Sequence, residues 1–227
     1  MCIASFVFND ESTIITFNRD ENKHRLSEFP SWHLHNGKSF FCPVDIQGGG
    51  TWLGYNRQII ATLQNGAYVK HIRTPPYNKS RGIILKNILE TNAIETFLNL
   101  EYLQDVEPFS LTIFNVELNK VVIFRYDGQQ LFKEEKIQNE SFILCSCTLY
   151  NEAAFGKIIH GFNGVNSMTA NNVLNFHLQY AIGKAANQFT TLADTVSVTQ
   201  FEINHQNNTT HCTYLDLVSN KEKTYTL

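Results

Sequence analysis

The sequence predicts an α+β fold in which two antiparallel sheets are covered by two layers of helices. Strand-like and helix-like segments follow one another in the order strands, helix pair, strands, helix pair, strands, and stacked sheets with outer helices accommodate that order. Short polar turns between neighbouring strand-like segments favour antiparallel hairpins. The chain has 227 residues without an internal repeat or a low-complexity tract, so we expect a single domain over residues 1–227.

The chain begins with a predicted β-hairpin. Residues 2–8 and 13–17 are rich in β-branched and aromatic side chains, and the polar residues 9–12 between them are typical of a turn. If this turn leaves Phe8 opposite Thr13, the remaining pairs of the hairpin follow. Turn length alone does not determine the register, and a slip by one residue would exchange the two faces of each strand.

In this register Cys2 lies opposite Arg19. Directly opposed side chains share one face of a sheet, with Cβ atoms about 5 Å apart. Arg19 is then within reach of the Cys2 sulfur, where its positive charge would favour the thiolate. Asn18 and Asp20 would point to the other face, because successive side chains of a strand alternate.

The next part of the chain contains an irregular segment and a second hairpin. Residues 22–47 hold two prolines and a glycine and are predicted to be irregular. Residues 51–56 and 58–63 predict the hairpin, and Asn65 with the glycine after it ends the second strand with a strong turn signal. A polar loop is expected over residues 70–79.

The remainder of the chain supplies both helix pairs and the other strands. Apolar residues recur at helical spacing within residues 84–98 and 155–182, which predicts two pairs of helices. The other apolar segments are typical of strands, and they cover residues 109–116, 121–126, 130–132, 142–149, 196–203, 211–217 and 224–227.

Composition excludes several classes of protein. The net charge is -3 and no basic stripe is present, so nucleic acid is not an expected partner. No apolar run approaches the roughly 18 residues of a membrane span, and the N-terminus lacks the pattern of a signal peptide, so we expect a cytoplasmic protein. The cysteines should then be reduced, and their odd number argues against a complete disulfide framework. They are Cys2, Cys42, Cys145, Cys147 and Cys212.

Cys2 is the first candidate for chemistry. If Met1 is removed, Cys2 carries both a thiol and a free α-amine, whose pKa of about 8 lets it act as a local base for the thiol. One residue would then supply nucleophile and base, and Cys2 should be the most reactive thiol of the chain. The alternative is a small buried residue at the start of an edge strand, and a retained Met1 would block the mechanism.

The tetrad Asn18-Arg19-Asp20-Glu21 is the second candidate. Arg19 beside Cys2 would supply a fixed positive charge for a thiolate or a carboxylate. Asp20 could pair with Arg19 or orient an amine. The alternative is a solvated polar end of the hairpin without a chemical role.

Together with later motifs, these residues resemble the NRDE family, also called the Transport and Golgi organisation protein 2 family. The motifs follow the family's order and spacing and cover the first half of the chain, whereas the second half matches mainly in its strand pattern. The matching stretches are Met1-Cys2-Ile3, Asn18-Arg19-Asp20-Glu21, residues 49–54 (Gly-Gly-Thr-Trp-Leu-Gly), Asn65 and Ser80-Arg81-Gly82.

The resemblance implies an N-terminal-nucleophile hydrolase-like fold, which is a four-layer αββα sandwich of two mainly antiparallel sheets. It also implies kinship with cysteine amidohydrolases of the penicillin V acylase and bile salt hydrolase type, which cleave amide C–N bonds. By that analogy the catalytic residues are Cys2, Arg19, Asp20 and Asn65, with the Asn65 amide as an oxyanion donor. The expected substrate-binding residues are Asn18, Glu21, Trp52 and Arg81.

Two departures from the family pattern weaken the case for amide hydrolysis. This chain has Ser146-Cys147 where the family has a Ser-Asn step, and residues 190–195 lack an arginine that the family carries there. The resemblance therefore also implies an alternative: a binding or trafficking protein for haem or acyl-type lipids on the same scaffold. Either function has a small molecule as its partner.

The weaker motifs predict structural roles. His33 and His35, like Cys145 and Cys147, lack the second ligand pair of a metal site, so no metal is expected. His177 lies on an apolar helical stripe and is expected to be a core histidine with its hydrogen bonds made. The glycines at 48–50 lack the following Lys-Ser/Thr of a phosphate loop and are expected to let the backbone pass close to Cys2.

Overall fold

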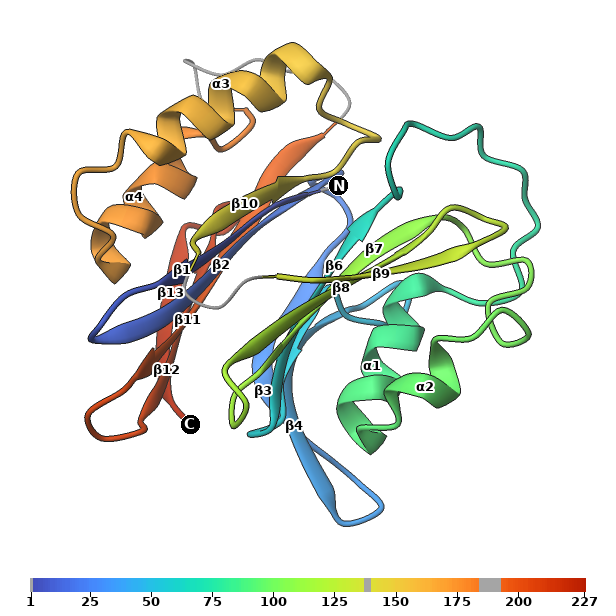
Figure 1. The fold of residues 1–227 in the computed structure, drawn as a ribbon, viewed down its shortest axis with the longest axis horizontal. Coiled ribbons are helices and arrows are strands. Elements are labelled where there is room, and N and C mark those ends of the chain that lie inside the picture. Colours follow the sequence, from blue (N-terminus) through green and yellow to red (C-terminus); the bar gives the residue numbers. More distant parts are fainter. Residues whose placement is uncertain (1, 137–139, 184–192) are drawn as a thin grey trace. The chain divides into compact units, whose positions relative to one another are not determined.

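The computed structural model describes residues 2–136, 140–183 and 193–227 (Figure 1). Within these residues, two antiparallel sheets carry four helices packed against them, which confirms the α+β class and the predicted order of strands and helix pairs. Each sheet belongs to one compact unit. The first unit combines residues 1–24 with 139–227, and the second comprises residues 25–138.

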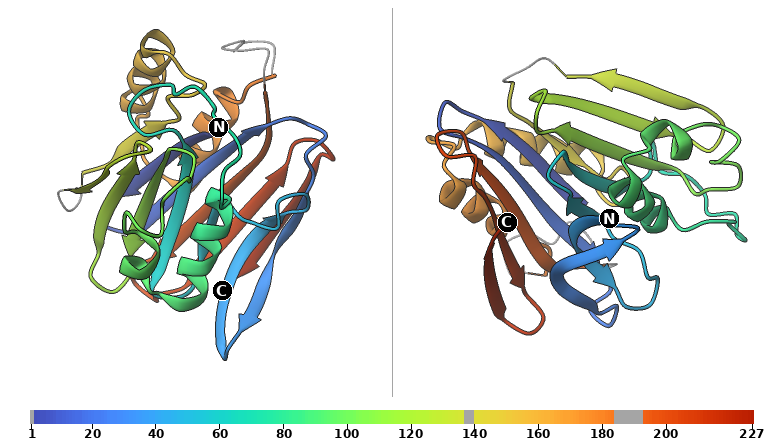
Figure 2. Two further views of the ribbon diagram at one scale, coloured as in Figure 1. Left: turned by 90° about the vertical axis from the view of Figure 1, so that its right-hand side faces the viewer. Right: turned by 90° about the horizontal axis from the view of Figure 1, so that it is seen from below.

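The first unit is built on a six-stranded sheet whose interior strand β2 carries the Asn18-Arg19-Asp20-Glu21 tetrad. Helices α3 (Glu152–Asn163) and α4 (Ala170–Gln179) cover one face of this sheet (Figure 2). The strand order is β10 (Phe142–Cys145), β1 (Cys2–Phe8), β2 (Ser12–Glu21), β11 (Asp194–Asn204), β12 (Thr210–Asp216) and β13 (Lys221–Thr226).

The two helices of the first unit pack an apolar stripe on the sheet, and a side chain caps the start of each helix. Ile158 and Phe162 of α3 and Phe176 of α4 are buried in one apolar cluster with residues of β1 and β2. The side chains of Asn151 and Thr169 accept hydrogen bonds from the first turns of α3 and α4, which satisfies backbone N–H groups that have no partner within the helix. The covered sheet face is therefore the one on which Asn18 and Asp20 lie.

The second unit is built on a seven-stranded sheet, with α1 (Arg81–Thr91) packed on it and the short helix α2 (Ile94–Phe97) directly after α1. The buried side of α1 consists of Ile84, Leu85, Ile88 and Leu89, which are spaced as one helical stripe. The strand order is β3 (Ser27–His35), β4 (Lys38–Asp45), β5 (Leu53–Tyr55), β6 (Ile59–Asn65), β7 (Phe109–Asn115), β8 (Lys120–Tyr126) and β9 (Leu131–Glu135).

The prediction of an irregular segment over residues 22–47 is wrong, because β3 and β4 form a hairpin there. Its two-residue loop, Asn36-Gly37, lies between the paired residues His35 and Lys38. Both loop residues have positive φ, 49° and 77°, as a type I′ turn requires. The Asn-Gly dipeptide was thus a hairpin signal of the same kind as the one we used at Asn65.

This hairpin was not predicted because it contains two prolines, which disfavour strands. The ladder between β3 and β4 shifts register between Glu28 and Ser31, and Pro30 lies within that irregularity. Pro43 lies on β4 across from it, between the paired residues Cys42 and Val44. Proline lacks a backbone N–H and is tolerated in a sheet at such irregularities and on edge strands, and β3 is an edge strand.

The predicted strand over residues 142–149 is too long. Strand β10 ends at Cys145, and the carbonyl of Ser146 then accepts hydrogen bonds from the backbone N–H groups of Leu149 and Tyr150. This turn leads the chain from the edge of the sheet into α3. Among the described residues, none of the helices has the length and apolarity that crossing a bilayer requires.

Candidate active site around Cys2

The structure confirms the predicted register of the first hairpin. Phe8 pairs with Thr13, and Cys2 pairs with Arg19. Their side chains therefore share the sheet face opposite the helices, because Asn18 and Asp20 are engaged on the helix-covered face. The hairpin thus brings Cys2 and Arg19 side by side on adjacent strands, as the turn count predicts.

Cys2 is buried, with 3% of its surface exposed. Burial raises the pKa of its thiol above the usual value, the charge of Asp20 raises it further, and a hydrogen bond with the Asp20 backbone acts in the opposite direction. This direction is opposite to the one that we expected from Arg19 alone. At neutral pH the sulfur is therefore held as a thiol, and a nucleophilic role requires a base.

Arg19 is also buried, with 5% of its surface exposed, and lies between Cys2 of β1 and Ser197 of β11. A solvated hairpin end, which was the alternative for the tetrad, is excluded at this position. The Arg19 side chain leaves the strand on the face of Cys2, and its planar guanidinium is a group that can hold a carboxylate or a developing oxyanion.

Asp20 is fully buried on the helix-covered face, so its side chain does not pair with Arg19. Tyr150 donates a hydrogen bond of 2.6 Å to one carboxyl oxygen, and Thr195 donates one of 2.6 Å to the other. Burial raises the pKa of Asp20 to about 6, although the bonds from Thr195 and Tyr150 lower it. The carboxyl group therefore titrates close to neutral pH.

Asn18 has a structural role that the sequence analysis missed. Its amide donates to the backbone carbonyl of His177 at 2.9 Å, and its carbonyl lies 2.7 Å from Nδ1 of the same histidine. Because the Asn18 oxygen can only accept, Nδ1 carries the proton, and Nε2 accepts from Ser5, whose hydroxyl lies 2.7 Å away. These contacts anchor α4 on the first hairpin. A role of Asn18 in substrate binding stays a prediction.

His177 is the core histidine that the apolar stripe predicts. It is fully buried and both ring nitrogens have partners. Burial lowers its pKa to about 3, so the ring is neutral over the physiological range. Since neither nitrogen is free to bind iron, this histidine does not fit a haem ligand.

Glu21 closes the tetrad at the end of β2. It pairs with Asp194 of β11, and its carboxylate accepts a hydrogen bond of 2.9 Å from the Asn22 backbone. This contact stabilises the exit of the strand. A role of Glu21 in substrate binding stays a prediction.

Three predicted site residues, Trp52, Asn65 and Arg81, belong to the second unit. Trp52 is buried before β5, and Asn65 is the last residue of β6, paired with Phe109. Their part in one site with Cys2 stays a prediction. Within the second unit, the structure shows a direct contact between two of the family motifs.

The glycine motif and the Ser-Arg-Gly motif are in direct contact. A Cβ atom on Gly50 would lie 2.6 Å from the backbone of Gly82, and the Thr51 N–H donates to the Gly82 carbonyl at 3.1 Å. Both glycines are therefore required for this close backbone approach at the start of α1. This contact is the one observed for Gly50, and the expected approach of residues 48–50 to Cys2 stays a prediction.

Arg81 is held by groups of its own unit. It lies 3.0 Å from a carboxylate oxygen of Glu107 and donates to the carbonyl of Pro108 at 3.0 Å. His71 and Arg73 reach the other oxygen of Glu107 at 3.0 and 3.1 Å. Burial lowers the pKa of Arg81 and the charge of Glu107 raises it, as expected of a buried ion pair.

All five cysteines are free thiols in the structure. Burial raises the pKa of Cys42 to about 12 and also raises those of Cys145 and Cys212. No cluster of His, Cys, Asp or Glu among the described residues is arranged to hold a metal ion. At the first departure from the family pattern, the Ser146-Cys147 step, the Ser146 hydroxyl lies 2.9 Å from the hydroxyl of Thr148. At the second, the segment without an arginine, residues 190–192 lie outside the described part of the chain.

Comparison with known families decides the assignment. The family model of Transport and Golgi organisation 2 matches residues 1–225, which is nearly the whole chain. The chain belongs to this family. A search of curated proteins finds no match. Membership of the Transport and Golgi organisation 2 family extends the resemblance seen in the first-half motifs over the second half, including β11 and the Asp20 partner Thr195.

Proposed function

We propose that the protein is a cysteine-nucleophile hydrolase or acyltransferase that acts on amide bonds through Cys2. The observation that carries the proposal is the pairing of Cys2 with Arg19 across β1 and β2, since these two buried residues share one face of the sheet. Neither group is needed there for an apolar core, and positive charge beside a cysteine is typical of reactive thiols.

The chemistry follows from the raised pKa of the Cys2 thiol. After removal of Met1, the free α-amine of Cys2 takes the thiol proton as the sulfur attacks the amide carbonyl carbon, which forms a tetrahedral intermediate. The C–N bond then breaks, the amine leaves with that proton, and a thioester remains on Cys2. Water, or an acceptor amine in a transferase, cleaves the thioester and restores the thiol.

Arg19 and Asp20 would have different roles in this reaction. Arg19 shares the sulfur's face of the sheet and would bind a substrate carboxylate or stabilise negative charge that develops on the carbonyl oxygen. Asp20 would act from behind the sheet, because its carboxyl group is held by Tyr150 and Thr195. Its backbone contact with Cys2 would position the sulfur.

The proposal includes the four-layer αββα stacking that family resemblance implies. In that arrangement Asn65, at the end of β6, would supply an oxyanion donor, while Trp52 and Arg81 would line the substrate side. Two observations support this part of the proposal: the family assignment, and the presence in each unit of one sheet with helices packed on it.

One observation favours the alternative of ligand binding without turnover. The thiol of Cys2 is held protonated by burial, so without a free α-amine it is a poor nucleophile. A buried neutral thiol next to Arg19 would still suit a binding site for an anionic small molecule, such as the acyl-type ligands that the resemblance implies.

The deciding experiment combines intact-mass analysis with reaction trapping. We expect a mass without Met1 and a stable covalent adduct at Cys2 after incubation with an acyl amide library or an N-acyl electrophile. The Cys2→Ser variant should show no thioester, and Cys147→Ser serves as the matched control that keeps labelling. A retained Met1, or adducts that persist in Cys2→Ser, would favour the binding function.

A further inference from the structure

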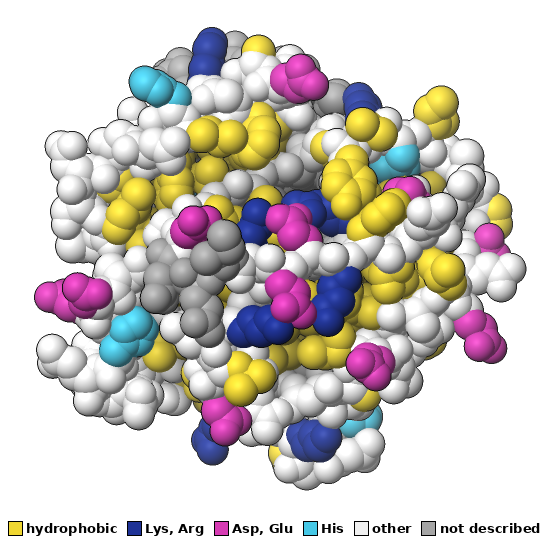
Figure 3. Space-filling view, in the orientation of Figure 1, with side chains coloured by type: hydrophobic (Ala, Val, Ile, Leu, Met, Phe, Trp, Pro, Cys, Tyr) yellow, Lys and Arg dark blue, Asp and Glu magenta, His cyan; other side chains and the backbone are white. Residues whose placement is uncertain are grey.

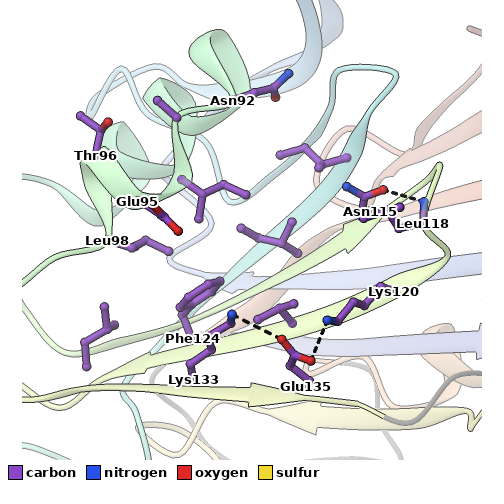
Figure 4. Close-up of a pocket in the computed structure, with 16 residues that line it drawn as sticks. Asn92, Glu95, Thr96, Leu98, Asn115, Leu118, Lys120, Phe124, Lys133 and Glu135 are labelled. Carbon is purple, nitrogen blue, oxygen red and sulfur yellow. Dashed lines mark hydrogen bonds and ion pairs between the residues drawn. The ribbon is translucent and has the colours of Figure 1, made fainter.

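The second unit contains a cavity that is distant in sequence from the tetrad and has no part in the proposed chemistry. It lies between α2 and the helix-covered face of β7, β8 and β9 and has a volume of about 790 Å³ (Figure 4). Cavities of roughly 300–1,000 Å³ are the size that small-molecule sites have in proteins. All residues that line it belong to the second unit.

The floor of this cavity is apolar. Ile113, Val122, Phe124 and Leu131 lie on the sheet, and Ile94 of α2 and Leu98 directly after this helix complete the apolar lining. Leu98 and Ile113 belong to the apolar core of the unit, and Ile94, Phe124 and Leu131 are partly buried against it. An apolar body of drug-like size would remove this surface from water.

One wall of the cavity has a local excess of positive charge. Lys120 of β8 lies 2.6 Å from one carboxylate oxygen of Glu135, and Lys133 of β9 lies 3.3 Å from the other. One carboxylate thus serves two ammonium groups. Figure 4 shows both lysines bonded to Glu135 at the sheet side, whereas Glu95 lies on the α2 side of the cavity.

The neighbouring charges of these strands do not compensate the excess. Arg125 and Lys136 both bond to Glu134, which alternates with Glu135 along β9 and therefore lies on the other face of the sheet. Lys or Arg and acidic side chains gather next to apolar ones in the region of β8 and β9 (Figure 3). The lysine wall is thus a preformed anion position at the end of an apolar cavity.

We propose that this cavity binds an amphipathic organic anion: an apolar body lies on the floor between α2 and the sheet, and one anionic group is held by Lys120 and Lys133. The anion adds a second negative charge to the pair of ammonium groups that now share Glu135. Glu95 across the cavity selects against a second anionic group on the body of the ligand.

The test uses two dyes with the same apolar body. Anilinonaphthalene sulfonate carries an anionic group, and N-phenyl-1-naphthylamine is its neutral counterpart. We expect one site per full-length chain for both dyes in fluorescence titration, with tighter binding of the sulfonate. Salt should weaken the sulfonate and leave the neutral dye unchanged, since only the former is held by charge.

Two substitutions with opposite expected effects on sulfonate affinity test the role of Lys120 and Lys133. Lys133→Met keeps the apolar stem, and removing one partly exposed charge should weaken the sulfonate about two- to fivefold while leaving the neutral dye unaffected. Glu135→Gln releases both lysines and should strengthen the sulfonate by a similar factor. Lys223→Met, on the exposed strand β13 of the first unit, is the matched control and should change neither dye.

Val122→Trp tests the floor, because it fills the cavity beside Glu135, with which Val122 pairs. It should weaken both dyes together, with far-UV circular dichroism confirming the fold. Equal effects of Lys133→Met on the two dyes, or unchanged binding in Val122→Trp, would overturn the proposal. So would a sulfonate affinity that Glu135→Gln leaves the same or lowers.

Discussion

The buried histidine of the first unit makes folding stability depend on acid in a way that can be calculated. His177 has a folded-state pKa of about 3, lowered by burial from a usual value near 6.5. A base whose pKa is lowered on folding stabilises the protein above its unfolded pKa and loses that contribution as the pH falls. We therefore expect the His177 contribution to be complete at pH 7 and to decline below about pH 6.5.

The magnitude follows from proton uptake. Between pH 7 and pH 4 the unfolded chain gains almost one proton at this position, while the folded chain gains almost none. At about 1.4 kcal/mol for each pH unit below the unfolded pKa, the free energy of unfolding falls by about 3 kcal/mol at pH 4. This is a large share of the stability of an ordinary domain.

The assay compares urea unfolding of the wild type and His177→Gln at pH 7, 6, 5 and 4. The variant should be less stable at pH 7, because it loses the bonds to Asn18 and Ser5. The difference in unfolding free energy between wild type and variant should then become smaller by about 3 kcal/mol at pH 4, because only the wild type has a histidine here that is protonated on unfolding. His24→Gln, at an exposed histidine, controls for the loss of an imidazole.

A gap that stays constant from pH 7 to pH 4 would refute the reasoning. It would mean that His177 can take up a proton in the folded state, so that the network with Asn18 opens or admits water. A gap that narrows equally for His24→Gln would assign the effect to histidine loss in the unfolded chain.

Two further predictions concern the tetrad. Asp20 has a raised pKa of about 6 in the folded protein, so its contribution to stability is complete below its unfolded pKa and is lost as the pH rises through 6. In urea unfolding, the free energy of unfolding of the wild type should therefore gain about 3 kcal/mol from this group between pH 8 and pH 3, and Asp20→Asn should lack that gain. Arg19→Ala should slow iodoacetamide labelling of Cys2 severalfold, because a positive charge on the sulfur's face of the sheet favours the thiolate that reacts. Arg19→Lys should retain most of the labelling rate, and equal labelling in all three proteins would make Arg19 purely structural.

The sequence predicted the elements of this fold where local signals agree. The register of Cys2 and Arg19 followed from strand composition once a four-residue turn was assumed, and the structure confirms that assumption, because a hairpin is a local structure. The β3–β4 hairpin was missed because its prolines were weighed above its Asn-Gly turn. Local propensity alone cannot show that a proline lies where a ladder is already interrupted.

The partners of the tetrad could not be predicted, because they are distant along the chain. Asn18 meets His177, and Asp20 meets Tyr150 and Thr195, only after α3, α4 and β11 have packed on the first hairpin. The spacing of polar residues in β2 shows which face each side chain takes. It does not show which helix or strand will supply the bond.

The alternation of β2 resolves how a run of four polar residues can lie in the interior of a sheet. A buried polar side chain destabilises the fold unless it is hydrogen-bonded. On the helix-covered face this requirement is met in full, since Asn18 bonds His177 and Asp20 bonds Tyr150 and Thr195. These hydrogen bonds are therefore a sufficient structural reason for Asn18 and Asp20 to be polar.

Arg19 is different, because it lies on the opposite face, directly beside Cys2, and is as buried as the core around it. Had the tetrad served only to fasten helices, an apolar residue at this position would have packed against the first hairpin at lower cost, since a buried charge carries a desolvation penalty. The two faces of β2 thus separate the roles of its side chains. The face that binds α4 and Tyr150 holds the strand in place, and the face of Cys2 and Arg19 is where a reaction or a ligand would be found.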